Sequence, residues 1–221
     1  MASITTAMCT TFKAELLQGE HNLQGTFTAT GTATSGSKNL TALSSIANIS
    51  PGLLVSDSGG SVPANTYTSK LISTSSVGVD TAATGTTGSD TFTFKGDSVA
   101  FALIKQGYTG TYGAANVNYS DITGNSDEAS GTGYTTGGYV WAAGAMITPA
   151  YSGTGAYTQP STNPSWTGAT LDVQGGMLYN STKLGKAICV ESFGGEQKVT
   201  GGTLTLLLPT NGVGTSLLQI N

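Results

Sequence analysis

Few residues in this chain of 221 could do acid–base, nucleophilic or metal chemistry. His21 is the only histidine, and Cys9 and Cys189 lie far apart with no CxxC spacing. One histidine cannot build a histidine-based metal cluster, and no nucleophile-elbow motif accompanies it. We therefore predict a structural or surface role for His21 and two buried free thiols, as expected in a reducing compartment.

The densest acidic segment runs from Asp121 to Glu128 and includes Asn125 and Asp127. Alternating oxygen ligands can hold calcium, but the glycine and the distal glutamate of an EF-hand loop are misplaced here. A solvated loop is the favoured interpretation, with calcium as the alternative. Phosphate-binding GxxxxGK[ST] and GxGxxG motifs are absent, and no carboxylate pair stands out for glycoside hydrolysis. The sequence indicates no catalytic residue, cofactor or metal.

Composition narrows the class of protein further. Apolar residues make up 38% and charged residues 9%, with a formal net charge of -4, which is typical of a folded chain. All eight basic residues are lysine, so bidentate guanidinium contacts to phosphate are impossible, and nucleic acid is a disfavoured partner. No apolar run approaches the roughly 20 residues of a membrane helix, and the opening residues do not resemble a secretion signal.

The segment 171–209 predicts the core of an antiparallel sheet. Three apolar runs, 177–179, 187–190 and 204–208, are separated by turn residues. The first two flank a polar connection of hairpin length, a Gly-Gly pair precedes the third, and Pro209 ends it.

Further strands are expected along the second half of the chain. Residues 98–105 are apolar on both faces, as in a strand covered on both sides. Other predicted strands lie near 119–122, at 139–146, from Trp166 onward and at 217–220, whereas 149–164 is predicted to be a loop. We predict a mainly β protein with a β-sandwich or jelly-roll-like main domain.

One helix is predicted, over residues 5–19. Thr5 or Thr6 would cap its start, and Gly19 would provide a left-handed end. Met8, Phe12 and Leu16 recur every four residues and form an apolar stripe. A helix of this length needs packing, so the stripe is a candidate assembly interface that covers either its own sandwich or a neighbouring subunit.

The amino-acid composition changes between residues 25 and 94, where Thr, Ser, Gly and Ala dominate around short apolar clusters. Two similar segments, 25–28 and 90–94, bracket this block and can pair to bring its ends together. We predict a small β module at 25–94, inserted into a main domain made of 1–24 and 95–221. A long flexible loop is the alternative.

Aromatic residues concentrate in the middle of the chain. Exposed Tyr and Trp favour contacts with carbohydrate or protein, so a binding surface is one interpretation. The other is that these rings cover the core and fill loop bases. The candidate surface residues are Tyr108, Tyr112, Tyr134, Trp141, Tyr151 and Tyr157.

Several segments resemble a group of small virion structural proteins of tailed bacteriophages. They are the Ala7-Met8-Cys9-x-x-Phe12-Lys13-x-Glu15-Leu16-Leu17-x-Gly19-x-His21 motif, the Gly- and Thr-rich segment Gly131–Gly138, and residues 178–181 and 193–195. Family members run almost directly from the helix to the strand at Asp97, whereas this chain carries an extra block that resembles β modules of phage tail and fibre proteins. The resemblance implies a component of the particle and transfers no catalytic residue.

The expected function is that of a non-enzymatic virion protein, made in the host cytoplasm. A capsid or neck decoration protein in symmetric multimers, bound to other virion proteins, is the first hypothesis. The alternative is a tail or fibre component that binds a host-surface glycan or protein, and a phage-borne glycan hydrolase is the third class. No membrane partner is expected.

Overall fold

The computed structural model describes residues 1–220 and shows a mainly β chain with two compact units. Unit 1 comprises Met1–His21, Ser98–Ala142 and the chain from Pro149 onward, and unit 2 comprises Asn22–Asp97 and Ala143–Thr148. The predicted division at 25–94 thus differs from the observed one by a few residues at each end and by the added segment 143–148.

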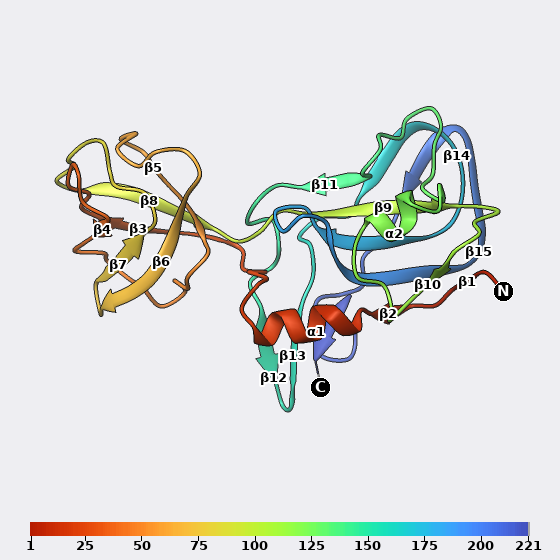
Figure 1. Cartoon of the computed structure of the whole chain (residues 1–221), viewed down its shortest axis with the longest axis horizontal. Helices are drawn as coiled ribbons and strands as arrows, with labels where there is room; N and C mark the ends of the chain where they lie inside the picture. Colours follow the sequence, from red (N-terminus) through yellow and green to blue (C-terminus); the bar gives the residue numbers. More distant parts are fainter. Residues whose placement is uncertain (221) are drawn as a thin grey trace. The chain divides into compact units, whose positions relative to one another are not determined.

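Unit 2 is a single six-stranded sheet in which all neighbours are antiparallel, in the order β3-β8-β5-β6-β7-β4. Its strands are β3 (Thr26–Gly31), β4 (Asn39–Leu40), β5 (Leu54–Asp57), β6 (Thr66–Ser73), β7 (Ser76–Val79) and β8 (Asp90–Lys95), drawn from red to yellow in Figure 1. The bracketing strands pair as expected, from Thr26 with Lys95 to Gly31 with Asp90.

Unit 2 closes its sheet on itself. Just past β3 and β4, the amide nitrogens of Thr32 and Thr41 each donate to the other's carbonyl, at 2.8 and 3.0 Å. The first and last strands of the sheet are therefore tied together just past their ends, which covers part of both edges. Alternate residues fill the interior, among them Leu40, Leu53, Val77, Phe92 and Phe94, and the rings of Phe27 and Phe94 stack at 5.3 Å.

Unit 1 is organised around a five-stranded antiparallel sheet in the order β11-β9-β14-β15-β2. These strands are β2 (Ala7–Met8), β9 (Val99–Lys105), β11 (Tyr139–Trp141), β14 (Ser165–Asn180) and β15 (Lys186–Thr205). The prediction of a strand apolar on both faces is confirmed at β9, where Val99 to Ile104 are all buried. The predicted hairpin is confirmed at β14 and β15.

Smaller elements complete unit 1. A second sheet has the order β12-β13-β16, from β12 (Ala150–Ser152), β13 (Gly155–Thr158) and β16 (Leu218–Ile220). Strand β1 (Ser3–Ile4) pairs in parallel with β10 (Thr111–Tyr112). The helices are α1 (Thr10–Leu17) and the single turn α2 (Ser120–Thr123). The predicted loop at 149–164 is wrong, because it contains the β12–β13 hairpin, whereas the strand predicted at 217–220 is confirmed.

The predicted helix over 5–19 is too long at its start. Residues 3–4 and 7–8 are extended and pair with β10 and β15, and Cys9 rather than Thr5 or Thr6 precedes the first helical turn. Pairing of these residues with distant strands outweighs local helix propensity. The expected C-terminal end is confirmed, because Gly19 has φ 73 and its amide nitrogen donates to the Leu16 carbonyl.

Three other local predictions are corrected. The segment near 119–122 is the helical turn α2, because Asn118 and Asp121 accept hydrogen bonds from nearby backbone amides and hold a turn. The strand predicted at 139–146 ends at Trp141. The apolar runs at 187–190 and 204–208 do not form two separate strands. A single strand, β15, continues through both Gly-Gly pairs to Thr205, and its pairing with β14 is irregular near these pairs.

Candidate functional site

The long hairpin of β14 and β15 shapes the most distinctive surface of unit 1. Its strands far exceed the usual 5–6 residues, and their pairing shifts register at Trp166/Ala169, Ala169/Leu171, Val173/Gly175 and Leu178/Tyr179. Such irregularities bend a strand and increase its twist. Figure 1 shows both strands curving, and residues 191–193 of β15 line a shared hollow with residues 206–208, which follow the C-terminal end of the strand.

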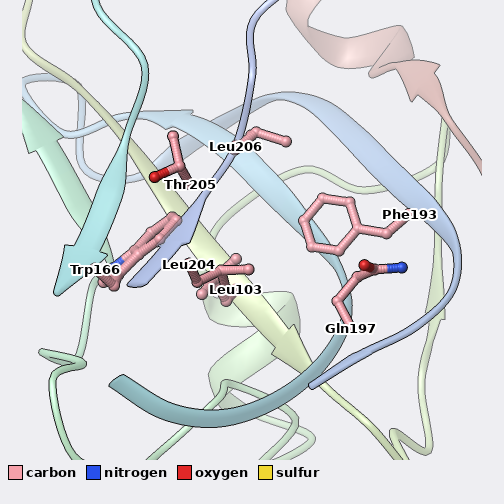
Figure 2. A pocket seen from close by; sticks show the side chains of 7 residues that line it. All are labelled: Leu103, Trp166, Phe193, Gln197, Leu204, Thr205 and Leu206. Atoms are coloured by element: carbon pink, nitrogen blue, oxygen red, sulfur yellow. The ribbon is translucent and has the colours of Figure 1, made fainter. Parts of the chain in front are cut away.

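A first hollow of about 260 Å³ lies inside this curve, and its lining is mostly apolar. Trp166 on β14 pairs with Leu204 on β15, and the ring of Phe193 lies across the hollow from them (Figure 2). Leu103 of β9 and Trp166 are buried, whereas Phe193, Leu204 and Leu206 remain partly exposed. The residues around the hollow are Leu103, Trp166, Phe193, Gln197, Leu204, Thr205 and Leu206.

A second hollow of about 330 Å³ adjoins the first and shares Phe193 and Leu206 with it. We call the two together the Phe193 groove. The second hollow is at the lower end of the size range of small binding sites, which are mostly apolar with a few polar groups. The lining of the second is Thr6, Glu191, Ser192, Phe193, Leu206, Leu207, Leu208, Pro209, Thr215, Ser216 and Leu217.

Glu191 is the charged residue of the groove. Burial raises the pKa of its carboxyl above the ordinary value, although hydrogen bonds from Thr6 and Cys189 act in the opposite direction. Within residues 1–220 none of the ion pairs involves Glu191. The groove therefore combines a large apolar surface with a carboxylate that forms no ion pair among the residues that the structure describes.

The acidic residues of 121–128 have a different environment. Asp127 is fully buried and accepts hydrogen bonds from the Tyr112 hydroxyl at 2.7 Å and from the amide nitrogens of Thr109 and Gly110 at 2.9 and 2.8 Å. Burial opposes ionisation, but these donors, together with Lys105, hold the pKa of Asp127 below its ordinary value. Asp127 is thus an internal anchor for the loop 107–111.

Glu128 and Asp121 anchor two further loops. Glu128 accepts hydrogen bonds from the hydroxyls of Tyr119 and Tyr134 and from the amide nitrogen of Gly137. Asp121 accepts from Asn116 and from the amide nitrogen of Val117. The prediction of a solvated acidic loop is therefore wrong for Asp127, and in residues 1–220 no group of three or more metal-ligating side chains could hold a metal ion.

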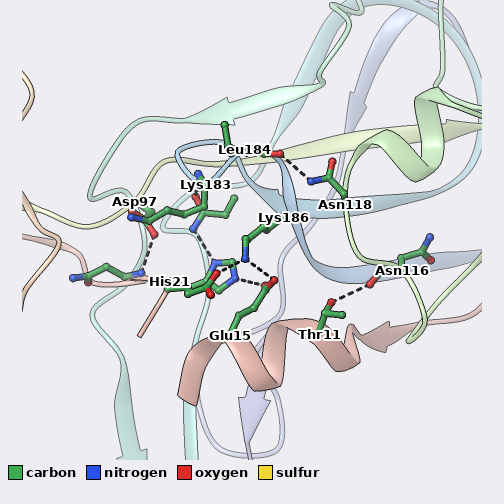
Figure 3. Close-up of polar contacts among 12 residues, drawn as sticks. Thr11, Glu15, His21, Asp97, Asn116, Asn118, Lys183, Leu184 and Lys186 are labelled. Carbon is green, nitrogen blue, oxygen red and sulfur yellow. Dashed lines mark hydrogen bonds and ion pairs between the residues drawn. The ribbon is translucent and has the colours of Figure 1, made fainter. Parts of the chain in front are cut away.

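His21 belongs to a polar cluster that fixes α1 to the β14–β15 turn (Figure 3). The Asn180 amide donates to His21 Nδ1 at 2.9 Å, and His21 Nε2 lies 2.8 Å from a carboxylate oxygen of Glu15. Lys186 forms ion pairs with both Glu15 and Glu20. The prediction that His21 is structural is confirmed, since the residue is buried and also packs edge-on against Phe12 at 4.9 Å.

The residues predicted as an assembly interface are not brought together as one exposed stripe. Phe12 is buried in unit 1, Leu16 is partly buried, and Met8 lies in β2 rather than on the helix. The stripe was expected to cover either its own sandwich or a neighbouring subunit. Its Phe12 side chain packs inside unit 1. The exposed side chains of α1 include Lys13 and Leu17 instead.

The predicted aromatic surface is also dispersed. Tyr112 and Trp141 are buried, and the Trp141 indole donates to the Thr162 carbonyl at 3.0 Å. These two rings therefore fill loop bases, which contradicts a surface role for them. Tyr134 is half-buried and bonded to Glu128, Tyr108 and Tyr157 are half-buried, and Tyr151 on β12 is 86% exposed.

Both cysteines are free and buried, as predicted. Burial raises the pKa of the Cys9 thiol to about 12 and also raises that of Cys189. A thiol is a poor nucleophile when it stays protonated, so these residues act as small apolar groups.

Sequence reasoning missed the groove. Leu204 and Leu206 alternate with Thr203 and Thr205, which predicts a strand with one apolar face but not what that face covers. Glu191 directly follows the buried run 187–190. A carboxylate at the end of such a run is the one sequence signal that could have pointed to the groove. The bending of β15 that joins these residues arises from tertiary pairing.

No protein-family model matches the chain, and no curated protein or solved structure is significantly similar to it. Among residues 1–220, no helix has the length and apolar character needed to cross a membrane.

Proposed function

We propose that this chain is a non-enzymatic structural protein of a bacteriophage virion, and that it decorates the capsid or neck as a symmetric multimer. Unit 1 contacts the neighbouring virion proteins, and unit 2 is displayed on the particle. The proposal includes synthesis in the host cytoplasm, a final location in the virion and a homo-oligomeric state.

The observation that carries the proposal is the unequal exposure of apolar side chains. Among residues 1–220, the large exposed apolar side chains of unit 2 are Leu71 and Ile72, and the others lie in unit 1. Apolar surface marks contact sites where it is contiguous, as at Leu207, which lines the second hollow with the partly exposed Phe193 and Leu206. The exposed unit 1 residues are Met1, Leu17, Val117, Val140, Tyr151, Leu184, Leu207, Val213 and Ile220.

Open strand edges support the same proposal. From Phe193 to Thr205, β15 pairs with β14 alone, because β2 covers only Cys189 and Val190. A free edge offers backbone donors and acceptors to another chain, and monomeric proteins usually protect it. In addition, the segments that resemble phage virion proteins, 7–21, 131–138, 178–181 and 193–195, all lie in unit 1.

The test is cryo-electron microscopy of purified particles labelled with an antibody fragment against residues 25–94. Label spread over the head or around the neck is the expected result. Particles that carry no label, while the chain is present in the infected-cell lysate, would contradict a virion role.

A tail or fibre component that binds a host-surface glycan or protein is the second candidate. It is favoured by the face of the β12-β13-β16 sheet, where Tyr151 lies opposite Ala156 and Ala156 lies opposite Ile220. All three residues are exposed, so an aromatic ring and two aliphatic groups form one row. Label confined to the tail tip, with binding to cells lost in Tyr151→Ala, would support this candidate.

A further inference from the structure

The second hollow of the Phe193 groove has the features of a protein docking site. Its volume of about 330 Å³ exceeds the roughly 150 Å³ of a cavity that holds benzene, so a leucine side chain and part of a lysine stem can enter together. Phe193, Leu206 and Leu208 provide partly exposed apolar surface, and Leu207 beside them is 75% exposed. An occupant with aliphatic side chains would bury this surface.

Glu191 restricts the chemistry of that occupant. Glu191 lines the same hollow and is partly buried, and its carboxylate forms none of the ion pairs within residues 1–220. A cation brought by the occupant would compensate for the cost of keeping this carboxylate ionised in partly apolar surroundings. The matching surface therefore needs an aliphatic side chain and an ammonium group a few ångströms apart.

The chain carries such a surface on α1. Leu17 is 92% exposed, Lys13 is exposed, and the four-residue spacing places both on one face of the helix. No ion pair in residues 1–220 involves Lys13. Neither side chain is used in the packing of α1 on its own unit, which relies on Phe12, Glu15 and His21.

We propose that the second hollow receives the Lys13–Leu17 face of a second copy of this chain, with Leu17 among the leucines and the Lys13 ammonium beside the Glu191 carboxylate. This inference rests on the self-association assumed in the proposed function. The donor face and the hollow are different patches, so the contact is heterologous and generates a ring when the rotation closes.

The first test compares the oligomeric state of the full chain, by sedimentation velocity and light scattering, with that of Leu17→Ser and Leu184→Ser. Leu184 is a matched control, because it is 91% exposed and lies in the β14–β15 turn. Leu17→Ser is expected to weaken self-association at least about tenfold, and Leu184→Ser less than about twofold. A wild-type chain that stays monomeric at every concentration, or equal effects of the two substitutions, would overturn the proposal.

The second test exchanges the charges. Lys13→Glu alone and Glu191→Lys alone should each lose self-association, because each places like charges at the contact. A mixture of the two variants should regain it, since glutamate at position 13 then meets lysine at position 191 and the remaining contact keeps its native pair. A mixture that stays monomeric overturns the proposal, and Glu191→Gln, expected to weaken association, replaces Glu191→Lys where thermal unfolding shows that Lys is not tolerated.

The outcomes separate this contact from the virion role. A chain that self-associates through Leu17 but is absent from particles would contradict only the proposed function. A chain found in particles that is monomeric in solution and insensitive to Leu17→Ser would contradict only the contact proposed here.

Discussion

Units 1 and 2 are both mainly antiparallel β structures, but they differ in how much apolar surface and strand edge they expose. Unit 2 ties Thr32 to Thr41, closes its sheet and keeps large apolar side chains inside, apart from Leu71 and Ile72 at the β6–β7 hairpin. Unit 1 leaves the edge of β15 that faces away from β14 uncovered beyond β2, keeps the Phe193 groove open and exposes side chains such as Leu17. This difference is the basis of our proposal that unit 2 is a self-sufficient module, whereas another chain completes the surface of unit 1.

The largest expected effect tests whether unit 2 is self-sufficient. Phe94 is fully buried and stacks on Phe27, so Phe94→Ala should cost about 3–5 kcal/mol of unfolding free energy. Chemical denaturation followed by fluorescence of Trp141 and Trp166, both in unit 1, should show no matching shift. A shift of the tryptophan transition by the same amount would show that the units unfold as one.

The next prediction concerns packing in unit 1. A Cβ added at Gly176 would lie 2.2 Å from Cε1 of Phe101, so Gly176→Ala forces the buried ring of Phe101 or the sheet to move. Overpacking of this kind typically costs about 1–3 kcal/mol. Thermal unfolding should show a lower midpoint, whereas Gly195→Ala, with open space around its added Cβ, serves as the control and should change stability little.

The loop anchored by Asp127 should make unit 1 sensitive to acid. Asp127→Asn at neutral pH should cost about 1–3 kcal/mol, because buried donors lose an ionised acceptor. The folded-state pKa of Asp127 is below the unfolded value of about 3.9, so its contribution is present above that pH and is lost as pH falls further. Urea titrations should therefore show the gap between wild type and variant narrowing below about pH 4.

Asp172→Asn is the matched control for this prediction. Asp172 lies 3.6 Å from Lys198, and both side chains are partly exposed, so the pair should contribute about 0–1 kcal/mol. Equal losses in the two variants would show that the buried hydrogen bonds of Asp127 have no special weight.

The smallest expected effect is a gain in stability. Leu184 adopts φ 56, a left-handed conformation that costs a non-glycine residue about 1 kcal/mol, and its side chain buries almost nothing. Leu184→Gly should therefore leave the unfolding free energy unchanged or raise it by up to about 1 kcal/mol. A clear loss of stability would show that Leu184 makes a contact within the chain that its exposure does not reveal.

Sequence patterns predicted the elements with strong local signals. The run Val99–Ile104, apolar on both faces, and the hairpin around 180–185 each carry their own periodicity and turn residues, and both are confirmed. The left-handed end of α1 was likewise predictable from Gly19. The pairing of 25–28 with 90–94 could be inferred because two similar strands flank a block of different composition.

Other features depend on contacts that no local pattern encodes. Residues 3–8 form strands because β10 and β15 are available to pair with them. The Phe193 groove exists because β15 bends and brings Glu191 and Phe193 close to Leu206. The acidic side chains at 121–128 point inward because loop amides and tyrosine hydroxyls donate hydrogen bonds to them. The closure of unit 2 depends on one bridge between Thr32 and Thr41.

The most direct measurement of the central claim is the copy number of this chain in purified particles, by quantitative mass spectrometry against the major capsid protein. The account predicts an integral relation to the particle's symmetry, with the tens to hundreds of copies expected of a decoration protein on the head, or a small multiple of the neck symmetry. Absence of the chain from particles, at a detection limit below one copy each, would contradict the account.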